Sequence, residues 1–380
     1  MINRIIEKSI QKLLFKGKAI LLFGPRQCGK TTLVKKIAET HKNDTLFING
    51  DEADMRIQFE NITSTQLKQF IGKAKLLIID EAQRISNIGL AIKLIVDNIK
   101  GVQVIATGSS AFELADKIKE PLTGRKYEFY LYPLSFTEMK NYLGMLEEKR
   151  LLEYRMIYGY YPEIVTSQGN EKQLLSLISD SYLYKDIYKL EQIKKPAIIE
   201  KLIQALALQL GNEVSYNELS RLVGADKETV ERYILLLEKA FVIFRLNALS
   251  RNMRKEIIRG KKIYFWDNGI RNSLIKNFNP INLRNDVGAL WENFLISERL
   301  KANHYGGKYV NYYFWRSLAQ QEVDYVEEMN GKMYAFEFKW KKENAKIPLM
   351  FTSLYPNNNT SFINKSNYVE FISSSEYNLS

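Results

Sequence analysis

The eight residues from Gly24 to Thr31 constrain this chain more than any other feature. They read Gly-Pro-Arg-Gln-Cys-Gly-Lys-Thr and fit the pattern G-x-x-x-x-G-K-[ST] without a mismatch. An apolar segment, Ala19–Phe23, precedes them, and a helix-like segment, Thr31–Thr40, follows. Between a strand and a helix, the glycines let backbone N–H groups surround a phosphate, and the helix N-terminus adds partial positive charge. The pattern therefore predicts a phosphate-binding loop.

Each residue of this loop has an expected role. Lys30 is expected to reach the β- and γ-phosphates of ATP, and the Thr31 hydroxyl to ligate Mg²⁺. The expected nucleotide contacts are Gly24, Pro25, Arg26, Gln27, Cys28, Gly29, Lys30, Thr31 and Thr32, with Thr107 added from a later strand. Cys28 occupies a variable position of the pattern, where we expect a small filler rather than a redox sensor.

Polar residues end the next apolar runs. Leu76–Ile79 is followed by Asp80, expected to complete the Mg²⁺ shell, and by Glu81, expected to orient or deprotonate the attacking water. A further run ends at Thr107 and Ser109, either of which could sense the γ-phosphate or position the water. Alternatively, Ser109 or Ser110 caps a helix.

Arg125 stands just before another apolar run. It is expected either to act as a catalytic arginine finger, from its own chain or from a neighbouring copy in a homo-oligomer, or to be a surface arginine.

The first ~145 residues alternate strand-like and helix-like segments. The strands are expected at Ala19–Phe23, Thr45–Ile48, Lys75–Ile79, Val102–Ala106 and Tyr127–Leu131. Such alternation is typical of a parallel sheet with helices on both faces. The fold class expected for residues 1–145 is thus α/β, a P-loop NTPase with a parallel sheet.

At these residues the chain resembles a family of bacterial and archaeal AAA-like ATPases that carry a C-terminal region of unknown function. The resemblance covers the phosphate loop, Asp80-Glu81-Ala82-Gln83, the residues from Thr107 to Ser110 and Gly124-Arg125. It extends through Leu131-Tyr132-Pro133-Leu134-Ser135-Phe136 and Glu138, apart from small substitutions. It implies ATP binding and ATP hydrolysis with Mg²⁺, without naming a substrate.

Composition excludes several other classes. A hydrophobic fraction of 46% excludes a wholly disordered chain, and a single cysteine excludes a disulfide framework. With two histidines, Cys/His zinc sites are nearly excluded, and no apolar run reaches the 18 residues typical of a membrane helix. Residues 1–14 indicate an amphipathic helix rather than a signal peptide. A soluble, cytoplasmic protein without a membrane partner is expected.

The net charge of +12 is concentrated in one segment. Residues 245–284 contain ten basic and two acidic residues. Two helix-like segments separated by Gly224 precede them, and two strand-like runs, 241–244 and 262–266, enclose the basic run. This order predicts a winged helix with a charged wing. The expected nucleic-acid contacts are Arg251, Arg254, Lys255, Arg259, Lys261 and Lys262.

The second of these helices carries Glu228, Glu231 and Glu238, so it is poorly suited to reading base edges in a major groove. Any DNA contact would then run through the wing and the phosphates, and it would depend on salt. Alternatively, the winged helix packs within the protein or binds another protein.

The last hundred residues contain Asp324 followed by Glu337-Phe338-Lys339 on strand-like segments, with Glu292 on an earlier helix-like one. Glu337 and Lys339 are two residues apart and share one face of a strand. This set resembles the restriction-endonuclease-like fold, which implies that Asp324 and Glu337 hold Mg²⁺ for phosphodiester cleavage and that Lys339 positions the water. The expected division is 1–145 ATPase, 146–210 helical lid or linker, 211–270 winged helix and 271–380 nuclease-like domain.

Two functions remain open from the sequence. The first is an ATPase coupled to a C-terminal module that acts on DNA. The second is a nucleotide-controlled signalling or assembly switch whose C-terminal half is a catalytically silent interaction module.

Overall fold

A computed structural model describes residues 1–109, 122–167, 169–190, 196–250, 260–341 and 346–373. The expected contacts Arg251, Arg254, Lys255 and Arg259, together with Ser110, lie outside these residues. The described chain groups into two compact units, the first built mainly by Met1–Pro133 and the second mainly by Leu134–Lys185, Ile193–Glu238 and Val242–Ser380. Each is described by itself.

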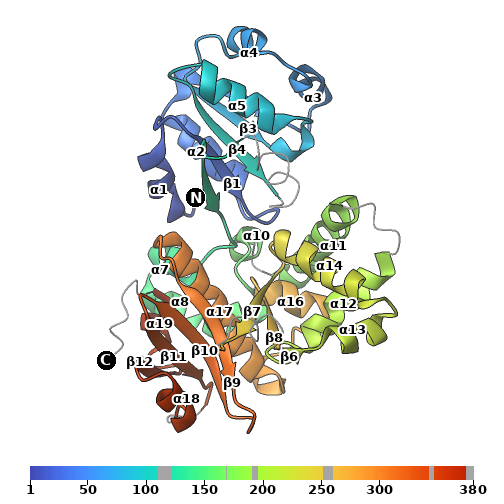
Figure 1. Cartoon of the computed structure of the whole chain (residues 1–380), viewed down its shortest axis with the longest axis vertical. Coiled ribbons are helices and arrows are strands. Elements are labelled where there is room, and N and C mark those ends of the chain that lie inside the picture. Colours follow the sequence, from blue (N-terminus) through green and yellow to red (C-terminus); the bar gives the residue numbers. More distant parts are fainter. Residues whose placement is uncertain (110–121, 168, 191–195, 251–259, 342–345, 374–380) are drawn as a thin grey trace. The chain divides into compact units, whose positions relative to one another are not determined.

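The first unit is organised around a five-stranded parallel sheet (Figure 1). Its strands are β1 (Ala19–Phe23), β2 (Thr45–Asn49), β3 (Leu76–Asp80), β4 (Gln103–Gly108) and β5 (Lys126–Tyr130), in the order β2-β3-β4-β1-β5. Every residue of the three inner strands β1, β3 and β4 is buried, whereas the edge strands β2 and β5 are largely half-exposed. Continuous burial is what a strand covered on both faces requires, and it explains why these runs were detectable in the sequence.

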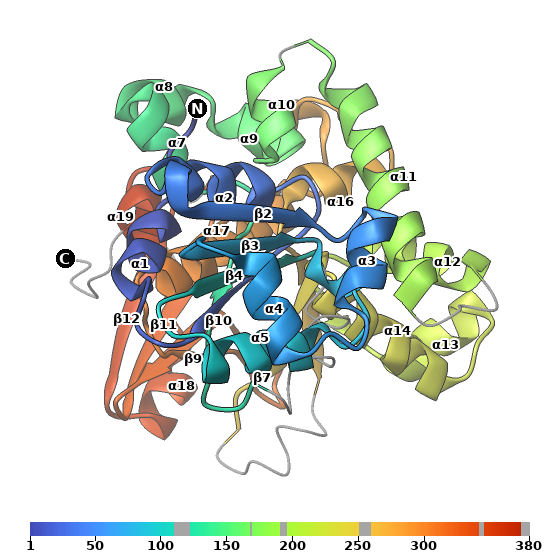
Figure 2. The ribbon, with the colours of Figure 1, turned by 90° about the horizontal axis from the view of Figure 1, so that it is seen from above.

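Helices cover both faces of this sheet (Figure 2). On one face lie α1 (Ile6–Leu13) and α2 (Lys30–Glu39), and on the other lie α4 (Ser64–Ile71) and α5 (Ile88–Asn98). A further helix, α3 (Ala53–Phe59), follows β2. Helix α4 begins where it does because the side chains of Thr63 and Gln66 form a reciprocal capping box. The expected α/β class with a parallel central sheet is confirmed.

The second unit contains one seven-stranded sheet in the order β12-β11-β10-β9-β7-β8-β6. Its strands are β6 (Glu213–Val214), β7 (Ile243–Ala248), β8 (Lys261–Phe265), β9 (Asn311–Arg316), β10 (Glu322–Met329), β11 (Lys332–Phe338) and β12 (Asn358–Ile363). The β7–β8 hairpin joins the C-terminal strands because β7 pairs in parallel with β9. The expected boundary at residue 270 therefore falls within a unit that shares a single sheet.

Two helices precede this hairpin, as the glycine turn predicts. They are α13 (Tyr216–Val223), which ends at Gly224, and α14 (Lys227–Lys239). Glu228 and Glu231 are exposed on α14 as expected, but Glu238 is half-buried and forms an ion pair with Arg245 of β7.

Residues 357–373 form a strand and a helix although this segment is rich in Asn and Ser. β12 pairs in parallel with β11, and α19 (Tyr368–Ser373) packs on α17 (Val287–Tyr305). On the opposite side of the sheet, α18 (Leu349–Leu354) places Phe351 in a core with Trp315, Val323 and Val326. Tertiary partners, not local propensity, define this segment.

The other described helices of the second unit lie mostly between residues 136 and 208, which includes most of the segment 146–210 expected to be helical. They are α7 (Phe136–Leu143), α8 (Met145–Arg150), α9 (Leu152–Tyr158), α10 (Pro162–Thr166), α11 (Glu171–Leu190), α12 (Pro196–Leu208) and α16 (Asn268–Leu274). Among the described residues, no helix has the length and apolar character needed to cross a membrane.

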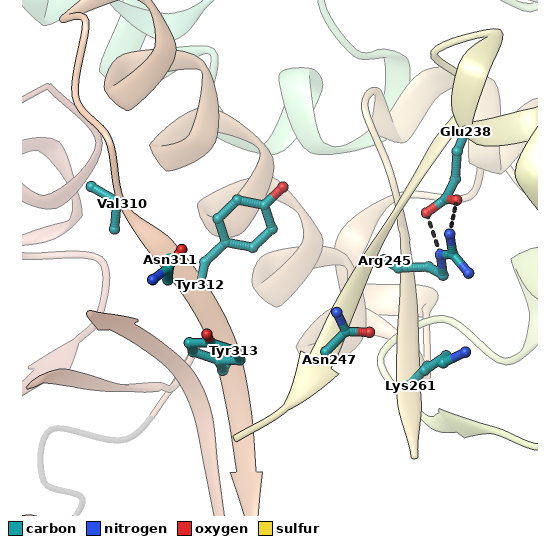
Figure 3. Close-up of a pocket in the computed structure, with 8 residues that line it drawn as sticks. All are labelled: Glu238, Arg245, Asn247, Lys261, Val310, Asn311, Tyr312 and Tyr313. Carbon is teal, nitrogen blue, oxygen red and sulfur yellow. Dashed lines mark hydrogen bonds and ion pairs between the residues drawn. The ribbon is translucent and has the colours of Figure 1, made fainter. Parts of the chain in front are cut away.

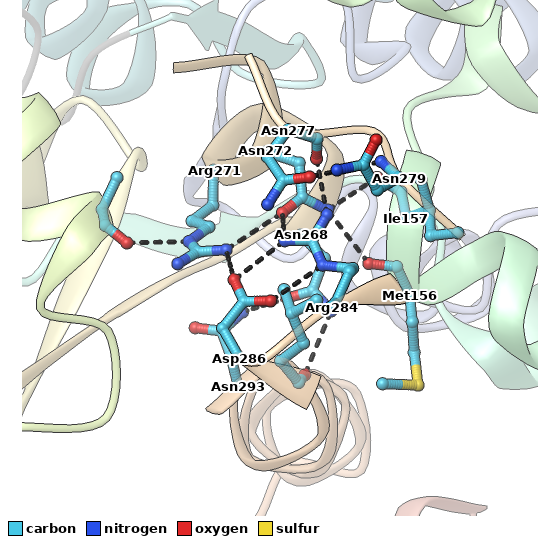
Figure 4. Close-up of polar contacts among 12 residues, drawn as sticks. Met156, Ile157, Asn268, Arg271, Asn272, Asn277, Asn279, Arg284, Asp286 and Asn293 are labelled. Carbon is cyan, nitrogen blue, oxygen red and sulfur yellow. Dashed lines mark hydrogen bonds and ion pairs between the residues drawn. The ribbon is translucent and has the colours of Figure 1, made fainter. Parts of the chain in front are cut away.

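Buried polar contacts join α9, α12, α16 and the start of α17 (Figure 4). Arg271 donates to the Ala207 carbonyl at 2.8 Å and pairs with Asp286, which also accepts from Arg284 at 2.8 Å. Asn272 donates to the carbonyls of Met156 and Ile157. Because an unpaired buried charge is costly, this network fixes how the four helices pack.

Candidate functional site

The phosphate loop connects the buried end of β1 to the start of α2. Gly24 passes so close to the Leu131 carbonyl that a Cβ there would lie 2.0 Å from its oxygen, so only glycine fits. The Lys30 side chain is 5% exposed and donates to the carbonyls of Gly24 and Pro25, each at 2.8 Å. An ammonium group is thus held inside the loop at the helix N-terminus, where an anion would be stabilised.

Three side chains form a hydrogen-bonded chain across the sheet beside this loop. The Thr31 hydroxyl donates to Asp80 Oδ2 at 2.7 Å, and the Thr107 hydroxyl donates to Asp80 Oδ1 at 2.5 Å. They meet because β4 lies between β1 and β3, so the carboxyl ends of the three strands are neighbours. A hydroxyl and a carboxylate oxygen are hard ligands of the kind that Mg²⁺ prefers, and the donor set fits that ion.

Glu81 follows Asp80 in a left-handed backbone conformation, with a φ of 49°. Its N–H donates to the Thr107 hydroxyl at 3.2 Å. Gln83, which is 2% exposed, donates to Glu81 Oε2 at 2.5 Å and to the Ser109 hydroxyl at 3.0 Å. Gln83 therefore links the expected catalytic carboxylate to the residue expected to sense the nucleotide.

Two residues outside the sequence motifs support the site. Arg4 is 8% exposed and donates to the carbonyls of Cys28 and Tyr132, each at 2.6 Å, so it supports the phosphate loop from outside the motif. Gly50 places its backbone against that of Glu81, where a Cβ would lie 2.4 Å from the Glu81 oxygen. No local pattern could reveal either contact, because each joins segments that are far apart in the chain.

The other residues expected to act in the nucleotide site do not all lie beside the phosphate loop. Cys28 is fully buried, and burial raises the pKa of its thiol, as fits a packing role. Thr32 is exposed on α2. Arg125 lies by the amino end of β1, where its carbonyl accepts from Ala19 N–H, and its guanidinium pairs with Asp97 at 2.7 Å. The phosphate loop is at the other end of β1, so Arg125 does not face the loop of its own chain.

Comparison with known proteins gives the same picture of the first unit. Residues 16–140 match an AAA domain family. The chain contains a P-loop ATPase-like AAA domain. Residues 149–281 and 287–375 match two further families, each described as a domain of unknown function (DUF8612 and DUF4143). The AAA domain thus stands beside a C-terminal domain of unknown function, which is the combination that the sequence resemblance implies.

The relatives that match most of the chain are described as uncharacterized proteins. One from Mycobacterium tuberculosis is 27% identical over 337 residues, covering 87% of this chain and 72% of that protein. Another, from Methanocaldococcus jannaschii, is 25% identical over 316 residues, covering 78% and 69%.

Solved structures resemble the chain more distantly. The ORC2 protein of Aeropyrum pernix in its ADP form matches with a TM-score of 0.34 and 15% identity, covering 63% of this chain and 85% of that one. The Pif1 helicase of Candida albicans matches with a TM-score of 0.27 and 15% identity, covering 41% and 48%.

The second unit brings the expected C-terminal residues together. The Lys339 ammonium donates to Glu337 Oε1 at 2.5 Å and lies 4.0 Å from Asp324 Oδ2. Asp324 also accepts from the Phe338 N–H at 2.7 Å. Burial raises the pKa of Asp324 to about 8, and the neighbouring Glu292 and Glu337 add to this shift. Glu292 of α17 thus belongs to the same acidic cluster.

Lys262 differs from its expected role as a nucleic-acid contact. It is 3% exposed and forms ion pairs with Glu292, at 3.2 Å, and with Glu322. Burial lowers its pKa, but these two carboxylates outweigh that effect and raise the pKa overall. A lysine enclosed in this way is not placed to touch a phosphate backbone.

Lys261, the other described basic candidate, lines a polar hollow of about 580 Å³ (Figure 3). The ion pair of Arg245 and Glu238 lies on the hairpin side of this hollow, and Tyr312 of β9 lies on the other. Lys261 faces Asn247 across the β7–β8 hairpin, at the base of the segment that contains residues 251–259. It is half-exposed and remains a candidate contact for an anionic ligand.

Proposed function

We propose that the first unit binds ATP with Mg²⁺ and hydrolyses it. The observation that carries this proposal is the chain of hydrogen bonds from Thr31 through Asp80 to Thr107, next to a phosphate loop that encloses Lys30. When bound, the metal ion would neutralise charge on the β- and γ-phosphates. Thr31 and Asp80 would hold it.

The other residues of the site would act on the phosphates and on water. Lys30 would exchange its two backbone carbonyls for phosphate oxygens, which are stronger partners for an ammonium. Glu81 would orient the attacking water and accept its proton. Thr107 would keep the Asp80 carboxylate and the Glu81 backbone in place through its hydrogen bonds to both.

Replacement of the loop lysine tests nucleotide binding. Lys30→Ala is expected to lose binding of a fluorescent ATP analogue, because the ammonium that faces the phosphates is gone. Lys35→Ala removes an exposed lysine from the same helix and is the matched control. Equal ATP affinity of Lys30→Ala and Lys35→Ala would refute the proposed site.

We further propose that the second unit acts on DNA through the cluster of Asp324, Glu337 and Lys339. Its support is that these side chains lie together and that Glu337 Oε2 is buried and, among the described residues, has no hydrogen-bond partner. A buried, unpaired carboxylate oxygen fits a divalent cation as its missing partner. The ion would supply charge stabilisation for phosphodiester cleavage. Lys339 would position the water.

The DNA proposal is tested with plasmid and single-stranded DNA, with Mn²⁺, at two salt concentrations and with or without ATP. Cleavage is expected to be lost in Asp324→Ala and retained in Glu328→Ala, which removes a half-exposed carboxylate from the same strand. Binding is expected to weaken as salt rises, since phosphate contacts release counterions. Intact DNA in every condition would refute the nuclease.

A second candidate is a nucleotide-controlled switch whose C-terminal half binds a protein and has no chemistry. The exposed Glu228 and Glu231 on α14 and the enclosed Lys262 favour it, because they leave less positive charge for DNA. Tight ATP binding with slow turnover, together with no salt-sensitive DNA binding, would favour this function over the first.

A further inference from the structure

The two hydroxyl residues at the end of β4 differ in how they use their hydrogen atoms. A serine or threonine hydroxyl has one hydrogen to donate and can also accept. The Thr107 hydroxyl donates its hydrogen to Asp80 Oδ1 and accepts from the Glu81 N–H. The Ser109 hydroxyl accepts from Gln83 at 3.0 Å, and this bond does not use its own hydrogen. Ser109 is therefore better suited than Thr107 to donate to a γ-phosphate.

A turn in the backbone directs Gln83 back toward Glu81. The φ of Glu81 is 49°, in the left-handed region that residues with a side chain rarely adopt. The short 3₁₀ helix η2 (Ala82–Arg84) follows directly, and the Arg84 N–H donates to the Glu81 carbonyl at 3.0 Å. Such backbone strain is often found at functional sites. Here it brings the side chains of Glu81 and Gln83 together.

The Gln83 amide nitrogen donates in two directions. One bond reaches Glu81 Oε2 at 2.5 Å, and the other reaches the Ser109 hydroxyl at 3.0 Å. Both bonds can form at once because the amide nitrogen has two hydrogens. Gln83 is 2% exposed and Ser109 is 4% exposed, so water has little access to these bonds. The position of the Glu81 carboxylate is thus tied to that of the Ser109 hydroxyl.

This arrangement gives the two oxygens of the Glu81 carboxylate different roles. Oε2 accepts from Gln83, which leaves Oε1 to accept a proton from the attacking water. A base is effective only when its oxygen is held within hydrogen-bond reach of the proton that it removes. A hydroxyl that donates its hydrogen also becomes a better acceptor. A γ-phosphate bound by Ser109 would therefore strengthen the bond from Gln83 to Ser109 and fix the amide beside Glu81.

We propose that Gln83 is a positioning residue, which transmits the contact between Ser109 and the γ-phosphate to the Glu81 carboxylate. It acts by holding Glu81 and not by touching ATP or the water. Once the γ-phosphate has left, Ser109 loses this acceptor and Glu81 is held less firmly. The inference rests on the ATP hydrolysis proposed above, and it adds that the rate depends on Gln83 and Ser109 as a pair.

The test measures ATP affinity and steady-state phosphate release by the full-length chain with Mg²⁺. Gln83→Leu keeps the approximate size of the side chain and removes the amide. Its ATP affinity should equal that of wild type, whereas kcat should fall about ten- to a hundredfold, because the base remains but is no longer held. Gln69→Leu replaces an exposed glutamine of α4 and should leave both values unchanged.

A double-mutant cycle tests the connection to Ser109. Ser109→Ala should lower kcat about as much as Gln83→Leu, whereas Ser109→Thr, which keeps the hydroxyl, should retain most of the wild-type rate. The variant with both Gln83→Leu and Ser109→Ala should be no slower than either single variant, because both changes break the same chain of bonds. Losses that multiply in the double variant would overturn the transmission from Ser109.

Melting temperatures of the same variants separate positioning from a loss of folded protein. If Gln83→Leu does not fold, the comparison of Ser109→Ala with Ser109→Thr carries the test, with kcat expected to differ at least about tenfold. Equal kcat values of these two variants would then overturn the role of the Gln83 and Ser109 pair.

The outcomes distinguish this inference from the function on which it rests. Phosphate release by Gln83→Leu at the wild-type rate overturns the role of Gln83 and leaves ATP hydrolysis standing. A loss of ATP affinity as large as the loss of kcat also overturns it, because a residue that only positions the base does not contribute to binding. Wild-type protein that binds ATP and releases no phosphate refutes the hydrolysis and the role of Gln83 together.

Discussion

Protonation of Asp324 should make the free energy of unfolding depend on pH. Its folded pKa of about 8 lies above the value of about 3.9 expected in an unfolded chain. The folded state therefore keeps a proton that the unfolded state has lost, and the free energy of unfolding should fall as pH rises from about 4 to about 8. A neutral side chain of the same shape removes this penalty.

Without divalent cations, Asp324→Asn should be more stable than wild type at pH 8, by up to about 5 kcal/mol, and the difference should vanish near pH 4. Urea unfolding at several pH values measures it, with Glu328→Gln as a control on the same strand. Identical pH dependence in wild type and Asp324→Asn would contradict the raised pKa.

For single residues, the sequence predicts those that belong to local motifs, but it does not predict those that connect distant segments. Thr107 was expected from its position at the end of a strand, and it does contact Asp80. Gln83 was noted only as part of a family motif, and Arg4 was not noted at all, since their partners depend on the fold. A charge count cannot show which lysines are enclosed, so it does not reveal that Lys262 pairs with Glu292 inside the protein.

A few buried charges hold α16 against the start of α17. Asp286 accepts from both Arg271 and Arg284 at the start of α17. Asp286→Ala should lower the free energy of unfolding of the second unit by about 3–5 kcal/mol, because it leaves two buried guanidinium groups without their carboxylate.

Glu153→Ala offers a matched comparison, since Glu153 forms an exposed ion pair with Lys365 in the same unit. Its effect should stay within about 1 kcal/mol. Chemical denaturation measures both variants, and equal costs would show that the network around Asp286 is not the stabilising feature proposed here.

Some strands and helices can be predicted from the sequence much better than others. The strands of the first unit were predicted within a residue or two, because buried strands are continuous apolar runs between turns. β12 and α19 were not, since their segment is polar and its order comes from pairing with β11 and packing on α17. The join between β7 and β9 also escaped prediction, because strand order in a sheet is not a local property.

The whole molecule contains two compact units, each with its own buried core. Calorimetry should therefore show two unfolding transitions. Mg²⁺ with ATP should stabilise the first unit alone. At a nucleotide concentration a hundred times the Kd, its free energy of unfolding should rise by about 2.7 kcal/mol, and its transition temperature should rise with it. Asp286→Ala, by contrast, should lower only the other transition.

A single transition that moves with both the nucleotide and Asp286→Ala would contradict this independence. It would mean that the two units unfold as one cooperative body.

The central claim is that the first unit hydrolyses ATP with Glu81 acting on the water. The most direct test is ATP binding and phosphate release by Glu81→Gln, which keeps the shape of the side chain and removes its capacity to accept a proton. We predict wild-type ATP affinity with phosphate release reduced at least about a hundredfold. Phosphate release by Glu81→Gln at the wild-type rate would contradict the claim.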